Sequence, residues 1–215
     1  MLIPRPETEL LVEAVLQQAE RLWPGRSIAA PDALAAPHAA ASASASAPLV
    51  AADIGTGSGA IAVTLAAQAP RWRVHASDIS PAALRVAAGN AARLQAAVAF
   101  REGNLLAPFA GMALDILVSN PPYIPAEDIA GLQREVRDFE PRLALDGGAD
   151  GLLPYRMMME QITLLAAPPR LIGFELGMGQ AEDIAELLRG TGHWNEIMTI
   201  PDYAGIDRHV LGVRV

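Results

Sequence analysis

The sequence contains no cysteine among its 215 residues, which excludes disulfide bonds and thiolate chemistry and fits a reducing compartment. Basic residues are few, 16 against 24 acidic ones, and the net charge of −8 argues against direct binding of nucleic acid. The four histidines are scattered without metal-ligand spacing, so we expect no metal site. No run approaches the roughly 18 apolar residues of a membrane span, and the charged N-terminus argues against a signal peptide. We therefore expect a cytoplasmic protein without a membrane segment.

The chain divides by composition into three parts. Residues 1–23 include PETELLVEAVLQQAERLW, whose apolar residues Leu11, Val15 and Leu22 recur at helical spacing. Residues 24–48 are rich in Ala, Ser and Pro and have little that would form a specific core, so we expect a flexible connector. Residues 49–215 would then form one folded domain, which suits a chain with 52% hydrophobic residues.

Strand-like and helix-like runs alternate from residue 49 onward. The segments that read as strands are LVAADI, RVHAS, AVAFRE, LDILVS and RLIGFEL. Helical patterns begin after GTGSG and at PAALRV, EDIAGL, PYRMMM and GQAEDI. This alternation predicts an α/β fold, doubly wound around a mainly parallel sheet. Two final β-rich runs, NEIMTIP and RHVLGVRV, predict an antiparallel C-terminal hairpin at one edge.

A glycine-rich turn follows the first predicted strand and opens a helix. It reads Asp53-Ile-Gly55-Thr56-Gly57-Ser-Gly59. Glycines allow a tight turn and let the backbone approach a ligand closely at the helix N-terminus. The turn also fits the dinucleotide pattern G-x-G-x-x-A, so by itself it leaves both NAD and S-adenosylmethionine open.

Asp78 ends the second predicted strand. In doubly wound folds an acidic residue at this point accepts hydrogen bonds from ribose hydroxyls, so the turn and the acid together predict a cofactor that carries adenosine. Asp53 favours S-adenosylmethionine, because a pyrophosphate is repelled by a nearby carboxylate, whereas a sulfonium with an amino-acid tail is not.

The fourth predicted strand delivers SNPPYI to the sheet edge where open α/β folds bind their ligands. A planar NH2 group is a weak nucleophile, so an enzyme that methylates it must hold both N–H bonds and aim the nitrogen. The side-chain carbonyl of Asn120 and the backbone carbonyl of Pro121 suit this task, and Pro121 with Pro122 stiffens the backbone. Tyr123 offers a π face to the substrate or the sulfonium. We predict that these four residues form the catalytic site of a methyltransferase acting on a planar nitrogen.

Together these motifs resemble the peptide chain release factor glutamine methyltransferases, a class I S-adenosylmethionine-dependent family with a Rossmann-like fold. The similarity extends over IPRPETELLVE, ADIGTGSGAIAV, SNPPYI, VRDFEPRLALDGGADGL and DYAGIDRHVLGVR. Ribosomal-protein glutamine methyltransferases share NPPY, but RPETE at residues 5–9 favours the release factor family. The resemblance implies methyl transfer from S-adenosyl-L-methionine to the side-chain nitrogen of a glutamine, in the Gly-Gly-Gln motif of a release factor.

The resemblance also implies roles for individual residues. Asn120, Pro121, Pro122 and Tyr123 would form the glutamine pocket. The residues that would contact the cofactor are Asp53, Gly55, Thr56, Gly57, Gly59, Asp78, Asn104, Asn120, Arg5 and Thr8, of which the last two lie near its methionine end.

The sequence departs from the family pattern in two places. Asn104 stands in EGNLL, where an acidic residue commonly meets the adenine amine, although its side-chain carbonyl also accepts a hydrogen bond. The helical N-terminal domain that helps the family recognise the release factor does not precede the IPRPETE segment, so the affinity for the protein partner stays open. We expect a monomer.

Two alternatives remain at this point. An adenine amine in DNA or RNA is also a planar NH2, so NPPY fits a nucleic-acid methyltransferase, although such an enzyme needs phosphate contacts and an extruded base. The glycine turn also fits an NAD-dependent oxidoreductase, but no acid/base constellation for hydride transfer is evident.

Overall fold

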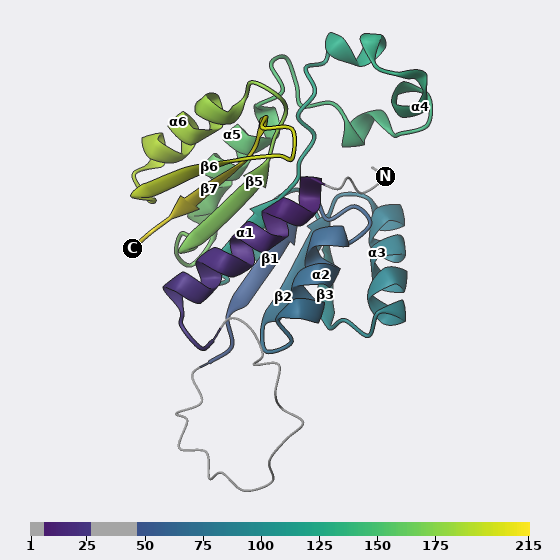
Figure 1. Ribbon diagram of the computed structural model, residues 1–215. Helices are drawn as coiled ribbons and strands as arrows, with labels where there is room; N and C mark the ends of the chain where they lie inside the picture. The colour runs from purple at the N-terminus through teal and green to yellow at the C-terminus, as the bar shows by residue number, and fades with distance from the viewer. Residues whose placement is uncertain (1–6, 27–46) are drawn as a thin grey trace, which may run out of the picture.

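The computed structural model describes residues 7–26 and 47–215, which fold around a seven-stranded sheet (Figure 1). The strand order is β3-β2-β1-β4-β5-β7-β6. The strands are β1 Val50–Ile54, β2 Arg73–Asp78, β3 Val98–Glu102, β4 Ile116–Ser119, β5 Leu171–Glu175, β6 Glu196–Pro201 and β7 Asp207–Val213. Strands β1 to β5 run parallel, whereas β7 is antiparallel to both β5 and β6. The predicted doubly wound α/β fold and its C-terminal hairpin are therefore confirmed.

Helices cover both faces of this sheet (Figure 1). One face carries α1 Glu7–Leu22, α2 Ala60–Gln68 and α3 Pro81–Arg93, and the other carries α5 Leu153–Gln161 and α6 Ala181–Thr191. Sequence signals mark several helix ends. The Ser80 hydroxyl accepts a hydrogen bond from the Ala83 amide at the start of α3, directly before Pro81. Gly192 ends α6 in the left-handed conformation, with φ at 70°.

Two separate cores follow from the alternation of side chains along each strand. Val118 and Leu171 point toward α1 and α2 on one face of the sheet. Leu117 and Ile172, their neighbours in sequence, point toward α5 and α6 on the other face. Because the strands are buried on both faces, they read as continuous apolar runs in the sequence.

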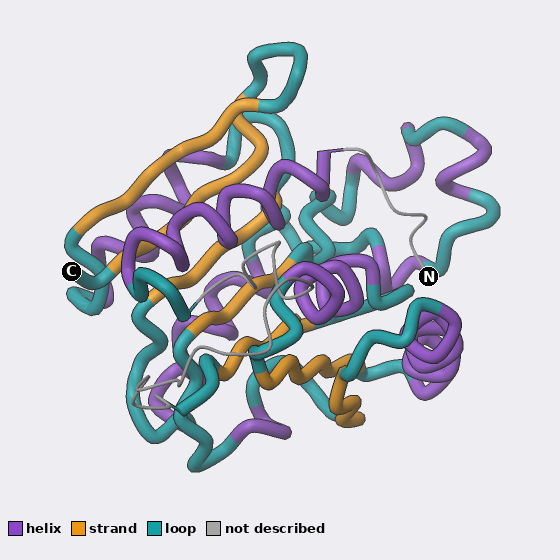
Figure 2. Tube along the Cα trace, turned by 60° about the horizontal axis from the view of Figure 1, so that its bottom comes forward, coloured by secondary structure: helices purple, strands orange, loops and turns teal. Residues whose placement is uncertain are grey.

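Helix α1 packs against β5 at Gly173. The helix lies across the sheet in Figure 1, and Figure 2 shows the same fold from a second direction. A Cβ atom at Gly173 would lie 3.2 Å from Val15 Cγ2 and 3.3 Å from Leu11 Cδ1. The missing side chain therefore lets the helix lie close to the strand. As a result, the first turn of α1 sits over the carboxyl end of β5.

Residues 120–152, between β4 and α5, project from the sheet and contain only short helices (Figures 1 and 2). The helix predicted at EDIAGLQREV is wrong in extent, because it is divided into η2 Asp128–Gly131 and α4 Arg134–Arg137. Leu132 and Gln133 between them have extended ψ angles of 156° and 142°. No residue of α4 is buried, so no packing supports a longer helix there. The remaining short helices are η1 Ala107–Phe109, η3 Arg142–Ala144 and η4 Ile162–Leu164.

Some of the sequence predictions concern residues that the structure does not describe. Arg5 lies outside them, as does most of the predicted connector 24–48, so the division into 1–23, 24–48 and 49–215 stays a prediction. Within residues 7–26 and 47–215, the helices are all too short or too polar to cross a bilayer. In those same ranges no three His, Asp or Glu side chains gather as a metal site would require.

Candidate active site

The carboxyl ends of four parallel strands bring together the residues that the motifs singled out. Asp53 lies near the end of β1, Asp78 ends β2, and Asn120 directly follows β4. Ser119 pairs with Phe174 in the sheet, so the next positions along the two strands are Asn120 and Glu175. Parallel strands end at one edge, and open α/β sheets bind ligands there. This end of the sheet is therefore the candidate active site.

The glycine turn approaches this edge with an open backbone. Gly55, Gly57 and Gly59 have φ angles of 71°, 56° and 84°, a conformation that strongly favours glycine. A Cβ at Gly55 would meet nothing within 4 Å, so space is left on its side of the turn. Gly59 serves packing instead, because its Cβ would lie 3.0 Å from the Ala87 Cβ of α3. The turn is therefore tightly packed where Gly59 faces α3, and it has open space beside Gly55.

Asp78 holds the glycine turn in place. Its Oδ2 accepts a hydrogen bond of 2.9 Å from the Gly57 amide, and its Oδ1 accepts one of 2.8 Å from the Ser80 amide. A carboxylate oxygen accepts more than one hydrogen bond, so these contacts leave acceptor capacity on Asp78 for a ligand hydroxyl. The residue lies where the sequence placed it, at the end of the second strand.

Asp53 is almost completely buried beneath the turn. Its Oδ2 accepts hydrogen bonds from the Thr56 hydroxyl at 2.5 Å and from the Ala62 amide at 3.1 Å. Its Oδ1 has no partner among the described residues. Burial raises the pKa of Asp53 to about 7, although these two hydrogen bonds oppose the rise. A cation that reached Oδ1 would favour the ionised form.

Asn120 lies against two buried side chains from distant elements. Its Nδ2 is 3.4 Å from the Thr8 hydroxyl of α1, which in turn donates a hydrogen bond of 2.7 Å to Glu175 Oε2. The Oδ1 of Asn120 is buried and has no partner among the described residues. Burial raises the pKa of Glu175, and the hydrogen bonds from Thr8 and Asn120 oppose that rise. Sequence reasoning missed Glu175, whose only signal is a lone carboxylate in the apolar run RLIGFEL.

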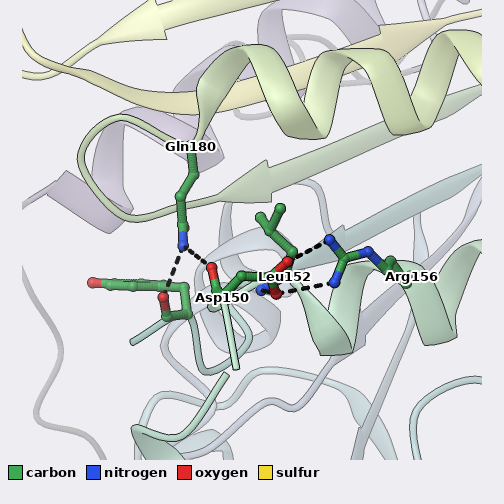
Figure 3. Close-up of polar contacts among 5 residues, drawn as sticks. Asp150, Leu152, Arg156 and Gln180 are labelled. Atoms are coloured by element: carbon green, nitrogen blue, oxygen red, sulfur yellow. Dashed lines mark hydrogen bonds and ion pairs between the residues drawn. The ribbon is translucent and has the colours of Figure 1, made fainter. Parts of the chain in front are cut away.

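The backbone of the NPPY segment is held from the other side by Gln180, at the start of α6 (Figure 3). Its Nε2 donates hydrogen bonds to the backbone oxygens of Tyr123 at 2.9 Å and Asp150 at 3.4 Å. Its Oε1 accepts one of 2.9 Å from the Gly177 amide. Sequence reasoning missed Gln180 as well, since one glutamine before a helix carries no distinctive pattern.

Two glycines make this close arrangement feasible. A Cβ at Gly151 would collide with the Tyr123 carbonyl oxygen and with Gln180 Nε2. A Cβ at Gly177 would lie 2.9 Å from Gln180 Oε1 and 3.1 Å from Tyr123 Cδ2. Asp150, beside Gly151, also forms a two-pronged ion pair with Arg156 of α5 (Figure 3). The segment after NPPY therefore folds back to support it.

Comparison with known proteins places this geometry in a family. A family model described as the methyltransferase small domain matches residues 43–144. The release factor glutamine methyltransferase of Moorella thermoacetica is 45% identical over 216 residues, which cover 100% of this chain and 68% of that protein. The protein of the same name from Bacillus cereus is 41% identical, over 98% of this chain and 68% of its own length. The chain belongs to the release factor glutamine methyltransferase family. The resemblance carried by the sequence motifs is therefore confirmed.

Solved structures support the fold of this family member at lower identity. A ribosomal protein L11 methylase from Lactobacillus delbrueckii is 19% identical, with a TM-score of 0.56 over 98% of this chain and 81% of that one. The N-terminal domain of human METTL16 is 17% identical, with a TM-score of 0.62 over 99% of this chain and 72% of that one. Both show the Rossmann-like arrangement of a methyltransferase, and at this identity they show the fold alone.

The remaining predicted residues are less enclosed. Pro121 is buried, whereas Pro122 and Tyr123 are partly exposed at the sheet edge. Asn104 is exposed in the loop after β3, where its backbone oxygen accepts a hydrogen bond of 3.1 Å from Ala107. The contacts of all these residues with a cofactor or a substrate stay predictions.

Proposed function

We propose that this family member transfers a methyl group from S-adenosyl-L-methionine to the side-chain amide nitrogen of a glutamine in a peptide chain release factor. The target is the glutamine of its Gly-Gly-Gln motif. The observation that carries the proposal is the buried, unpartnered Oδ1 of Asn120 at the carboxyl edge of the sheet. A buried acceptor without a partner is unfavourable by roughly 1–3 kcal/mol, and residues 7–26 and 47–215 supply none to this oxygen, so it is suited to accept a hydrogen bond from the substrate amide. We place the activity in the cytoplasm and in a monomer.

The residues at the sheet edge fit the cofactor. The space in front of Gly55 admits a ligand close to the backbone. The Oδ1 of Asp53, which has no partner within the described part of the chain, suits the ammonium group of the cofactor's methionine end. Asp78 retains acceptor capacity for ribose hydroxyls, and Asn104 lies where the adenine amine is expected. Thr8 and Arg5 complete the methionine end in this proposal. When bound, S-adenosylmethionine supplies an electrophilic methyl group on a sulfonium.

The NPPY segment positions the substrate nitrogen. Asn120 Oδ1 accepts one N–H bond of the glutamine amide, and the backbone carbonyl of Pro121 accepts the other. With both N–H bonds fixed, the nitrogen lone pair is directed at the methyl carbon instead of rotating freely. Pro121 and Pro122 restrict the backbone, and Gln180 fixes it at Tyr123. Transfer would form the new N–C bond while the methyl–sulfur bond of the donor breaks, with S-adenosylhomocysteine as the leaving group. The nitrogen would then lose one of its two protons to water, and a secondary amide would be the product.

The decisive experiment is transfer of a labelled methyl group from S-adenosylmethionine to a release factor. We expect label on the native release factor and none on a variant whose Gly-Gly-Gln glutamine is replaced by glutamate. Label that survives this replacement would refute the assigned target. A parallel incubation with adenine-containing RNA and DNA should stay unlabelled, and labelling there would favour the nucleic-acid alternative.

Asn120→Ala separates substrate positioning from cofactor binding. We expect this variant to bind S-adenosylhomocysteine with unchanged affinity by calorimetry while losing about a hundredfold or more in kcat, because the acceptor that aims the nitrogen is gone. A variant that no longer binds S-adenosylhomocysteine would show that Asn120 holds the cofactor instead.

A further inference from the structure

Three polar side chains from three distant elements form one hydrogen-bonded chain beside the NPPY segment. Thr8 lies in the first turn of α1, Asn120 directly follows β4, and Glu175 is the last residue of β5. The Thr8 hydroxyl donates to Glu175 Oε2 at 2.7 Å, and Asn120 Nδ2 donates to Thr8 Oγ1 at 3.4 Å. Thr8 and Glu175 are only 8% and 3% exposed, so water does not readily replace these contacts.

The direction of each hydrogen bond is fixed by the chemistry of Glu175. An ionised carboxylate only accepts hydrogen bonds, so the single O–H of Thr8 must point toward it. The Thr8 oxygen then offers only its lone pairs to Asn120. Asn120 must therefore turn its NH2 group toward Thr8, which directs its Oδ1 away from this chain of contacts.

This direction matters because the two ends of an asparagine amide are nearly equal in size but opposite in polarity. A flipped Asn120 would present NH2 to a substrate NH2, which leaves two donors facing each other and no acceptor. Packing by shape alone does not distinguish the two orientations. Some polar contact must do so if Asn120 is to serve as an acceptor.

We infer that Glu175, acting through Thr8 and through its own contact with the Asn120 amide, is a positioning residue that sets the amide orientation of Asn120 and so makes Oδ1 the acceptor for the substrate amide. This inference rests on the proposed function, since it concerns the acceptor used by the same site. The sheet builds the arrangement directly, because the register of β4 and β5 sets Asn120 beside Glu175. Close packing of α1 on Gly173 then brings Thr8 over both.

Glu175→Gln tests the inference with almost no change in shape. The new side chain has an NH2 group in place of one acceptor, and that donor competes for Asn120 Oδ1 or displaces the Thr8 O–H. We expect kcat for methyl transfer to fall about 10- to 100-fold, with unchanged KM for S-adenosylmethionine and unchanged affinity for S-adenosylhomocysteine. Folding should be retained, because a neutral amide is less costly to bury than a carboxylate. Glu160→Gln, the same change on an exposed position of α5, should behave as the unmodified protein.

Thr8 provides an independent pair of variants. Thr8→Val keeps the shape but removes the hydroxyl, and it should lower kcat by a similar factor. The Tm should also fall, because the buried Glu175 Oε2 loses its donor. Thr8→Ser restores the hydroxyl and should recover most of kcat, which a purely structural role for the methyl group would not allow. Thr163→Val removes an exposed hydroxyl that bonds only locally and should leave kcat unchanged.

A spectroscopic readout keeps the inference separate from the proposed function. In ¹⁵N–¹H spectra of the full chain, the side-chain NH2 signals of Asn120 should shift in Glu175→Gln and in Thr8→Val but not in Glu160→Gln. Unshifted signals, or unchanged kcat in a folded Glu175→Gln, would overturn the inference. Loss of S-adenosylhomocysteine binding in that variant would overturn it too, because Glu175 would then act on the cofactor. If the unmodified protein methylates no release factor, the proposed function fails, while the spectra still decide the role of Glu175.

Discussion

The glycine turn and the NPPY segment lie at the same sheet edge but are supported in different ways. The turn is held by residues close in sequence, since Thr56 and Ala62 bond to Asp53 from three and nine residues away, and Asp78 bonds to Gly57 across 21. The NPPY segment is held from much farther away, because Thr8 is 112 residues from Asn120 and Gln180 is 57 from Tyr123. A local motif thus builds the predicted cofactor side, whereas the packing of the whole sheet builds the predicted substrate side.

Among substitutions that disturb only the residues supporting NPPY, the largest effect is expected from Gly151→Ala. Alanine there combines left-handed strain, at φ 78°, with a collision against the Tyr123 carbonyl. The strain is about 1–2 kcal/mol, and the displaced backbone should lower kcat by about a hundredfold. Affinity for S-adenosylhomocysteine should stay within about twofold, because the glycine turn does not depend on Gly151.

Gly111→Ala is the matched control for this substitution. Gly111 has a similar φ of 74°, but nothing lies within 4 Å of its added Cβ. The control should lose a similar amount of stability from strain while kcat is retained. Equal losses of kcat in the two variants would mean that strain, and not the contact with NPPY, explains the effect.

The next largest effect is a pH dependence of the affinity for S-adenosylhomocysteine, which we attribute to Asp53 beneath the glycine turn. Burial raises the pKa of Asp53 to about 7, so in the free protein the group is protonated below that pH and ionised above it. The ammonium group of S-adenosylhomocysteine favours the carboxylate, so binding below pH 7 must release a proton. Affinity should therefore rise as the pH rises, with a loss of about tenfold at pH 6 relative to pH 8 and a plateau above the pKa.

Calorimetry in buffers of different ionisation enthalpy would measure this proton release directly. Asp53→Asn should bind more weakly and show a flat pH profile. A pH profile that is equally steep in Asp53→Asn would assign the titration to another group. The kcat losses predicted for Gly151→Ala should appear at every pH. The pH profile therefore distinguishes an effect on the NPPY segment from an effect on the glycine turn.

A smaller effect is expected from Gln180→Ala. This change removes the hydrogen bonds with Tyr123, Asp150 and Gly177 but introduces no collision. We expect kcat to fall several-fold and the free energy of unfolding to drop by about 1.5–4.5 kcal/mol, the contribution of three hydrogen bonds. Gln68→Ala, at an exposed position in α2, controls for the loss of a glutamine. Unchanged kcat in Gln180→Ala would show that the NPPY backbone holds its position without this side chain.

The smallest effect is expected from Arg156→Gln, which removes the ion pair with Asp150 (Figure 3). The hydrogen bonds lower the pKa of Asp150 to about 2, but both side chains are largely exposed and water screens the pair. We expect kcat within about twofold of the unmodified protein. A larger loss would place Arg156 among the supports of NPPY.

Much of the fold was predictable because each element carries a local signal. Apolar runs marked the buried strands, Pro81 marked the start of α3, and the short loop before RHVLGVRV marked the hairpin. The strand order was not predicted, since it depends on pairings between distant segments. The helix expected at EDIAGLQREV failed because Ile129 is the only buried residue of this segment, so a longer helix would have no buried face to support it.

The residues of the candidate site likewise fall into those that a local motif predicted and those that it did not. Asp53, Asp78 and Asn120 come from motifs whose residue types and spacing indicate their place at the sheet edge. Glu175 and Gln180 have no motif, and only the register of β5 and the turn before α6 bring them to Asn120 and Tyr123. Physical proximity created by long-range packing leaves little trace in a single sequence.

A double-mutant cycle between Glu175 and Asn120 tests most directly the claim that distant residues aim the NPPY segment. If Glu175 acts through Asn120, Glu175→Gln lowers kcat about 10- to 100-fold in the unmodified protein and leaves the residual kcat of Asn120→Ala unchanged within about twofold. Labelled methyl transfer is sensitive enough to follow the slow variants. The same fold-loss in both backgrounds would contradict the account, because the two residues would then act independently.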